Sequence, residues 1–92
     1  MSKNIQVIYT KSARKDLEKI DNTFARKIVL KIKEYTTENP LKKSKVLTGA
    51  FSGLYRYRIG DYRAIFEYDS ERNVVTIYIL VIKHRKDVYK RI

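Results

Sequence analysis

The sequence LYRYRIGDYRAIFEY, residues 54–68, contains two alternating runs of apolar and polar side chains that only Gly60 and Asp61 separate. A two-residue connection of this kind is typical of a tight β-hairpin. We therefore predict strands over residues 54–59 and 62–68. Because a two-residue loop also fixes the register of the strands, Arg58 is expected to face Arg63.

This register divides the side chains of the hairpin between two faces. The predicted core face consists of Tyr55, Tyr57, Ile59, Tyr62, Ala64 and Phe66. The other face carries Arg56, Arg58 and Arg63, with Ile65 and Glu67 further along. Like charges directly opposite each other destabilise a sheet, whereas a planar guanidinium group suits phosphate. The arginines therefore indicate an anion-binding face; the alternative is a solvated face with Glu67 as a partial counter-charge.

The segments before the hairpin are expected to form a strand and two helices. The expected elements are a strand over residues 5–9, a helix over 11–20 capped by Thr10 or Ser12, a break at Asp21-Asn22-Thr23, and a helix over about 24–37 that ends before Asn39-Pro40. Residues 45–47 are expected to form a short edge strand, and residues 48–53 a loop with two glycines.

After the hairpin, residues 70–73 form a turn and the nearly all-apolar run 74–82 is predicted as a central strand covered on both faces. Residues 83–92 form a basic tail of one or two helical turns. The expected fold is a single α+β domain over residues 1–92. It has an N-terminal strand, a helical hairpin, an antiparallel sheet of three to four strands and a short basic C-terminal tail.

Composition narrows the expected partners and sites. The 92 residues include 21 Lys and Arg against ten Asp and Glu, and the net charge of +11 favours polyanions. Nucleic acid is the first expected partner, an acidic protein the second and an anionic membrane the third. The absence of cysteine fits a reducing compartment, so we expect a cytoplasmic protein. With one histidine, no carboxylate pair, no phosphate-binding glycine loop and no membrane-spanning run, we expect no metal, no cofactor and no membrane partner.

The basic tail is the second candidate functional segment. If the strand over residues 74–82 is the antiparallel neighbour of the Arg63 strand, the tail brings His84, Arg85 and Tyr89 towards the arginines. Tyr89 offers a stacking face for a base, and His84 a titratable proton. The alternatives are a surface histidine without a role and a tyrosine that packs the tail onto the core.

These residues suit metal-free chemistry on RNA. The 2′-hydroxyl of RNA can attack the adjacent phosphate and leave a 2′,3′-cyclic phosphate. Arginines can stabilise the charge that develops on the phosphate oxygens, while Lys83, His84 or Tyr89 can transfer protons. The sequence therefore makes RNA cleavage the leading functional hypothesis.

Three motifs together resemble the RelE/ParE toxin superfamily. They are Val46-Leu47-Thr48-Gly49, Leu54-Tyr55-Arg56-Tyr57-Arg58-Ile59-Gly60-Asp61-Tyr62-Arg63 and His84-Arg85-Lys86-Asp87-Val88-Tyr89. The likeness covers nearly the whole chain, and the tail that ends in tyrosine favours the RelE branch. The resemblance implies a ribosome-dependent endoribonuclease that cleaves mRNA in the 30S A site and is silenced by a cognate RelB-like antitoxin.

The resemblance also assigns roles by position. Arg56 and Arg58 match basic residues of the active strand, and Arg63 matches an arginine that binds the scissile phosphate. Lys83 and Arg85 match basic residues after the last strand, Tyr89 matches a tyrosine that stacks on the substrate base, and His84 has equivalents in some relatives. Some relatives carry lysine where Arg56 and Arg58 stand. Arginine stays protonated, so the base here is Lys83 or His84, or else proton removal relies on electrostatics.

Other functions are compatible with the same fold. One alternative is a ParE-like toxin that inhibits DNA gyrase without cleaving RNA. Another is a non-catalytic nucleic-acid-binding module whose affinity weakens steeply with salt. A third is an inactive descendant that retains only antitoxin binding.

Overall fold

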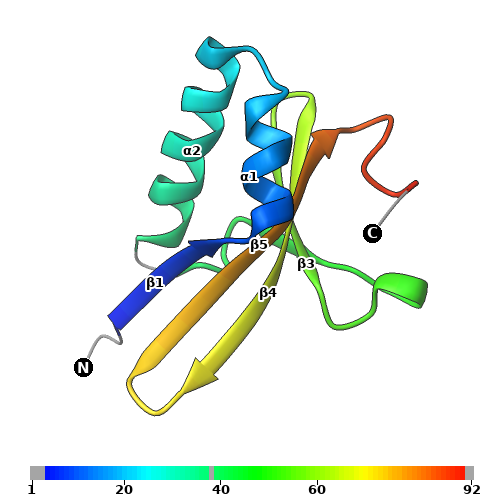
Figure 1. The fold of residues 1–92 in the computed structure, drawn as a ribbon. Helices are drawn as coiled ribbons and strands as arrows, with labels where there is room; N and C mark the ends of the chain where they lie inside the picture. The colour runs from blue at the N-terminus through cyan, green and yellow to red at the C-terminus, as the bar shows by residue number, and fades with distance from the viewer. Residues whose placement is uncertain (1–3, 38, 91–92) are drawn as a thin grey trace.

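Two helices cover one face of a five-stranded sheet (Figure 1). The structure, a computed structural model, describes residues 4–37 and 39–90. The elements in chain order are β1 (Asn4–Tyr9), α1 (Lys11–Glu18), α2 (Asn22–Thr36), β2 (Ser44–Val46), the 3-10 turn η1 (Gly49–Phe51), β3 (Tyr55–Ile59), β4 (Tyr62–Glu71) and β5 (Val74–His84). None of the helices in the described ranges is long and apolar enough to span a membrane.

The sheet order is β1-β5-β4-β3-β2. The strands from β2 to β5 are antiparallel neighbours, while β1 pairs with β5 in parallel. The predicted α+β class, N-terminal strand and helical hairpin are confirmed. The N-terminal strand also joins the sheet, which therefore has five strands and is mixed rather than purely antiparallel. β5 is a central strand, as its apolar sequence predicted.

The hairpin of β3 and β4 has the predicted register. Arg58 lies opposite Arg63, and Tyr57 lies opposite Ala64. On the other side of β4, Arg63 lies opposite Lys83, and the register shifts by a bulge after Ile65. The tight turn at Gly60, which has a φ of 58°, closes the hairpin. A two-residue loop accommodates the positive φ easily when glycine occupies it.

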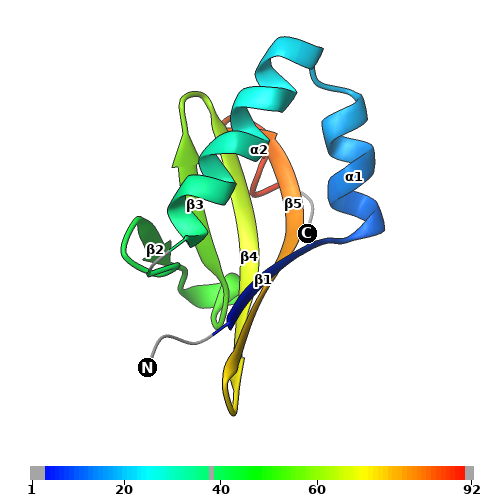
Figure 2. The ribbon, with the colours of Figure 1, turned by 90° about the vertical axis from the view of Figure 1, so that its left-hand side faces the viewer.

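Apolar side chains lie on both faces of the sheet. The larger core lies between the sheet and the helices, and its fully buried members include Ala13, Ile28, Ile32, Tyr57, Ala64, Phe66, Ile77 and Ile79. A smaller cluster on the opposite face contains Ile65, Val81 and Val88. Figure 2 shows the helices on a single side of the curved sheet. The second cluster therefore anchors the C-terminal tail on the face that the helices leave open.

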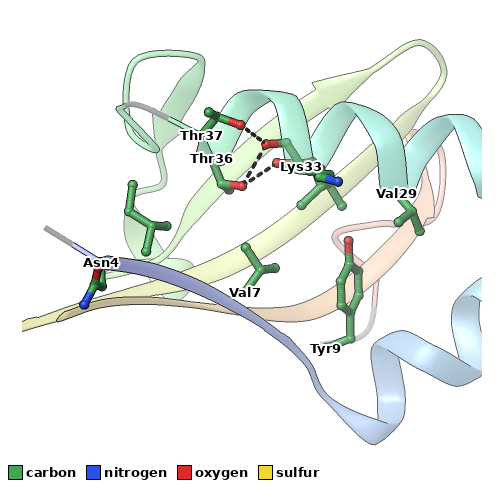
Figure 3. Close-up of a pocket in the computed structure, with 9 residues that line it drawn as sticks. Asn4, Val7, Tyr9, Val29, Lys33, Thr36 and Thr37 are labelled. Carbon is green, nitrogen blue, oxygen red and sulfur yellow. Dashed lines mark hydrogen bonds between the residues drawn. The ribbon is translucent and has the colours of Figure 1, made fainter. Parts of the chain in front are cut away.

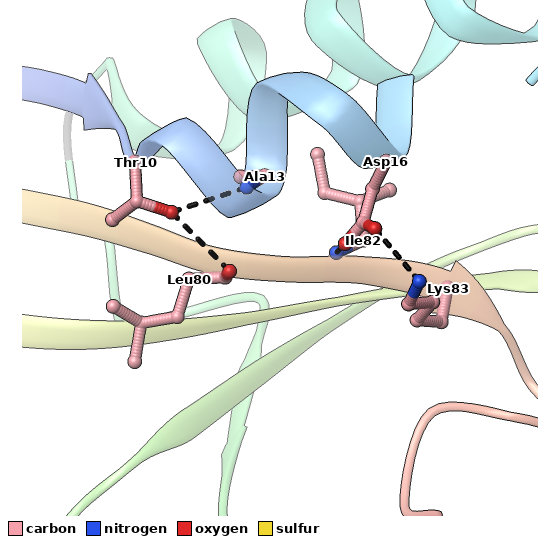
Figure 4. A network of polar contacts seen from close by, with 6 residues as sticks. All are labelled: Thr10, Ala13, Asp16, Leu80, Ile82 and Lys83. Atoms are coloured by element: carbon pink, nitrogen blue, oxygen red, sulfur yellow. Dashed lines mark hydrogen bonds and ion pairs between the residues drawn. The ribbon is translucent and has the colours of Figure 1, made fainter. Parts of the chain in front are cut away.

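Beyond the end of β1, side chains at the start of α1 and within it bond to the edge of β5. β1 pairs with β5 only as far as Ile79, so beyond this residue β5 has a strand, β4, on one side only. The Thr10 hydroxyl donates to the carbonyl oxygen of Leu80 at 3.3 Å and accepts from the Ala13 amide, which caps α1 as predicted. The Ile82 amide donates to Asp16 Oδ2 at 3.0 Å (Figure 4). Side chains of α1 therefore replace a missing strand.

The C-terminal tail differs from the predicted helical turns. β5 includes Lys83 and His84, and residues 85–90 form consecutive turns. The amides of Asp87 and Val88 both donate to the His84 carbonyl oxygen. Val88 is completely buried against the smaller cluster. Burial of Val88 and the hydrogen bond from the Arg85 amide to the Asp61 carbonyl oxygen hold the tail against the sheet; residues 91–92 of the predicted tail lie outside the described residues.

Candidate nucleic-acid interface

Three cationic side chains form a row across the open face, at the end of the sheet next to the β3–β4 turn. Arg58 on β3, Arg63 on β4 and Lys83 on β5 are direct cross-strand neighbours. Arg63, the central one, is only 9% exposed, and its guanidinium group donates to the carbonyl oxygens of Gly60 and Tyr62. These two bonds hold the buried guanidinium group against the hairpin turn.

The positive charge of this face has little local compensation. Burial and the neighbouring charges of Arg58, Arg56 and Arg85 lower the pKa of Arg63 from its ordinary value. In the described part of the chain, Arg56, Arg58 and Arg63 have no carboxylate within ion-pair distance, whereas Arg85 lies 3.8 Å from Asp61. Because arginine remains protonated, the cluster favours an anion such as a phosphate group. This arrangement supports the predicted anion-binding face.

Tyr89 lies beside Arg56 at one side of the arginine cluster. Its hydroxyl accepts a hydrogen bond of 3.1 Å from an Nη of Arg56, and its ring centroid lies 5.5 Å from that of Phe51. The side chain is still 42% exposed. The Nε of Arg56 is enclosed and has no hydrogen-bond partner. Val88, and not Tyr89, packs the tail onto the sheet, so Tyr89 keeps an accessible aromatic surface beside the arginines.

Arg85 ties the start of the tail to the hairpin turn. Its amide donates to the Asp61 carbonyl oxygen at 2.7 Å, and its Nε lies 3.8 Å from the Asp61 carboxylate. The guanidinium group is more than half exposed and contributes to the field around Arg63. Arg85 therefore lies at the edge of the arginine cluster, as the sequence predicted.

Lys83 belongs to the row but is already paired. Its Nζ lies 2.7 Å from Asp16 Oδ1, and the Asp16 side chain is only 6% exposed (Figure 4). The ion pair therefore joins the end of the row to α1, at the edge where α1 meets β5.

His84 does not lie with the arginines. Successive side chains of a strand point to opposite faces, and since Lys83 lies on the open face, His84 lies on the helix-covered face. There its ring contacts Tyr62, with 5.7 Å between centroids, and its Nδ1 accepts from the Lys86 amide. The expectation that the tail brings His84 to the arginines is thus wrong in placement, because the strand extends through this residue.

Two residues near the site were not predicted from the sequence. Lys45 on β2 lies directly opposite Arg56 and extends the basic face to the sheet edge. The sequence of residues 45–47 predicted a short edge strand, but the long loop before β3 left the pairing of this strand with β3 undetermined. Phe51, in η1, contacts Tyr89 across a separation of 38 residues, and no local pattern predicts such a contact.

Two cavities described next lie on the helix-covered face of the sheet. A groove of about 720 Å³ runs between α2 and the hairpin turn, with Phe24, Leu30, Tyr62 and His84 among its lining residues. A smaller cavity of about 470 Å³ lies between β1 and α2 (Figure 3). Tyr9 projects into it, and burial raises the pKa of its hydroxyl to about 12. Neither cavity includes the arginines, so the open face is separate from both.

Comparisons with known proteins agree with this architecture. The family model described as ParE toxin of type II toxin-antitoxin system, parDE, matches residues 7–89. Toxin RelG of Mycobacterium tuberculosis is 32% identical over 85 residues, which are 92% of this chain and 95% of that protein.

Solved structures show the same fold. In the toxin–antitoxin complex RelBE2 from M. tuberculosis, the similar chain has a TM-score of 0.75 and 31% identity, with 95% of this chain and 97% of that one covered. In the RelB–RelE antitoxin–toxin complex from Methanococcus jannaschii, the similar chain has a TM-score of 0.67 and 27% identity. The match covers 92% of this chain and 98% of that one. These likenesses define the class as toxins of type II toxin–antitoxin systems. Within it, the chain belongs to the RelE family of the RelE/ParE superfamily.

Proposed function

We propose that this toxin is a ribosome-dependent endoribonuclease that cuts translated mRNA in the A site. The observation that carries the proposal is the largely uncompensated cluster of Arg56, Arg58 and Arg63 beside an accessible Tyr89. Phosphate and a nucleobase are the two parts of RNA that such a surface recognises. The open face of the sheet is therefore the proposed RNA site.

The proposed reaction uses side chains of this protein, the RNA and solvent water. The 2′-oxygen forms a bond to phosphorus, the bond from phosphorus to the 5′-oxygen breaks, and the products are a 2′,3′-cyclic phosphate and a 5′-hydroxyl. Negative charge grows on the phosphate oxygens during this step. Arg63, held rigidly in the middle of the row, is proposed to stabilise that charge, with Arg58 and Arg56 beside it. Tyr89 orients the strand by stacking on a base.

The reaction also requires two proton transfers. The 2′-hydroxyl must lose a proton and the 5′-oxygen must gain one. Lys83 is charged and bound to Asp16, and can deliver a proton to the leaving oxygen as an acid. His84 can serve as a base only if the tail turns over, because its ring lies on the helix-covered face. We therefore propose that Lys83 is the acid, that the 2′-proton passes to solvent water, and that the arginines favour its loss by stabilising the 2′-oxyanion.

The test is to induce the toxin in bacteria and map the 5′ ends of translated mRNAs. The wild type is compared with Arg63→Ala, Tyr89→Ala and the double variant. Arg14→Ala is the matched control, because it removes an exposed positive charge from α1, away from the open face. Cuts within reading frames that persist in the control and vanish in the double variant support the proposal.

Other outcomes identify the rival functions. Growth arrest with intact mRNA would refute the nuclease and favour a ParE-like action on DNA gyrase. RNA binding without arrest or cleavage would favour a non-catalytic module or an inactive toxin. Loss of cleavage in the control as well would show that total charge, rather than the open face, matters.

We also propose that a RelB-like antitoxin neutralises this toxin and covers the groove beside α2. Phe24 and Leu30 are 51% and 64% exposed, and Lys27 and Lys31 lie along the same groove. Glu34, which pairs with Lys31, and Asp61 also line the groove, so the exposed apolar surface between these charges fits the apolar face of an amphipathic segment. Leu30→Glu should weaken binding of the cognate antitoxin in calorimetry, while Glu18→Ala on α1 should not.

A further inference from the structure

The loop between β2 and β3 brings a second aromatic ring to the arginine face. Residues 48–53 turn tightly, with positive φ angles of 67° at Gly49 and 92° at Gly53. The Ser52 amide donates to the Gly49 carbonyl oxygen, and the Leu54 amide to that of Phe51. Left-handed glycines at both ends allow this reversal. The backbone that carries Phe51 is therefore held by its own hydrogen bonds.

Tyr89 depends on this loop for its orientation. Burial of Val88 fixes the backbone of the tail, but it leaves the side-chain rotamer of the next residue free. Two contacts restrict that rotamer. The Phe51 ring lies 5.5 Å from the Tyr89 ring at an interplanar angle of 44°, and Arg56 donates to the Tyr89 hydroxyl. The Tyr89 side chain stays 42% accessible beside these two contacts.

We propose that Phe51 is a positioning residue that holds the Tyr89 ring so that its free side receives a nucleobase. The proposal rests on the proposed RNA site and extends it to the β2–β3 loop. Because the ring is oriented before RNA arrives, stacking does not first require loss of rotamer freedom. The same arrangement keeps the Arg56 guanidinium beside the ring. Its Nε is enclosed and has no hydrogen-bond acceptor in the free protein.

The first measurement concerns the free protein. The Tyr89 χ1 rotamer is read by NMR from its Hα–Hβ couplings in the wild type, in Phe51→Ala and in Phe51→Tyr. Loss of the Phe51 ring should average these couplings over several rotamers, while Phe51→Tyr should retain the wild-type values. Val46→Ala is the control, because Val46 is an exposed apolar residue just before the loop and next to Lys45 in β2. Unchanged Tyr89 Hα–Hβ couplings in Phe51→Ala would overturn the proposal.

The second measurement is a double-mutant cycle on cleavage of translated mRNA in a purified ribosome system. An aromatic pair contributes an amount that corresponds to about a two- to twelvefold effect. Phe51→Ala should therefore lower kcat/KM by about that factor in the wild-type background and should have almost no effect in a Tyr89→Ala background. Phe51→Tyr should restore most of the activity.

The cycle separates positioning from a purely structural role. If Phe51 only stabilises the fold, its removal lowers kcat/KM by the same factor in both backgrounds, and the proposal fails. If the wild type itself does not cleave, the proposed function fails and the nucleobase role with it. The NMR comparison then still decides whether Phe51 orients Tyr89.

Discussion

Replacing Asp16 on α1 by alanine should markedly destabilise the toxin. The carboxylate is 6% exposed and has two partners on β5, the Ile82 amide at 3.0 Å and the Lys83 ammonium at 2.7 Å. Both contacts occur where β1 no longer covers the edge of the strand (Figure 4). The variant leaves the amide without its partner and the lysine without its counter-charge.

The size of the effect follows from these two contacts. An enclosed amide left without an acceptor costs about 1–3 kcal/mol. The ion pair adds only about 0.5–1 kcal/mol, because Lys83 is 35% exposed and remains partly hydrated after the carboxylate is lost. The two losses together amount to about 3 kcal/mol, a large part of the roughly 5–15 kcal/mol that stabilises a domain. For a chain of this length, that corresponds to a fall in Tm of about 12–24 °C.

Urea unfolding followed by circular dichroism measures this loss. Asp16→Asn is the informative second variant, since its amide oxygen can still accept from Ile82 while its charge is gone, and it should lose less stability than Asp16→Ala. Glu18→Ala is the control, because Glu18 is an exposed carboxylate on the same helix, and its loss should change stability by less than about 0.5 kcal/mol. A loss below about 1 kcal/mol for Asp16→Ala, with an unchanged m-value, would refute this account of how α1 replaces a strand.

Three further outcomes are expected. Val88→Ala should cost about 2 kcal/mol and speed hydrogen exchange of the tail amides, because Val88 is fully buried against Ile65 and Val81; unchanged exchange would contradict this. Arg58→Thr should raise stability by about 0.2–1 kcal/mol in urea, since it relieves repulsion with Arg63, yet should reduce RNA cleavage. The raised pKa of Tyr9, about 12, means that stability is intact below about pH 10 and falls between there and about pH 12. Tyr9→Phe should make that fall smaller in denaturation curves at successive pH values.

The sequence by itself determined the hairpin and the arginines on it. The Gly60-Asp61 connection sets the register of β3 and β4, and alternation then assigns each side chain to a face, so local pattern alone was enough to put Arg56, Arg58 and Arg63 on one face. Thr10 as the cap of α1 and β5 as a central strand followed from equally local patterns. These features depend on residues close together in the chain, where geometry leaves few alternatives.

Only the tertiary structure decided which side chains from distant segments meet. β1 lies parallel to β5, so Asp16 reaches Lys83 across 67 residues, and Phe51 reaches Tyr89 across 38. The extension of β5 through His84 puts that histidine on the helix-covered face, although the sequence alone suggested a place beside the arginines. Such contacts depend on which helices and strands pack against each of the two apolar clusters. No spacing along the chain records that distribution, because it depends on burial summed over the whole domain.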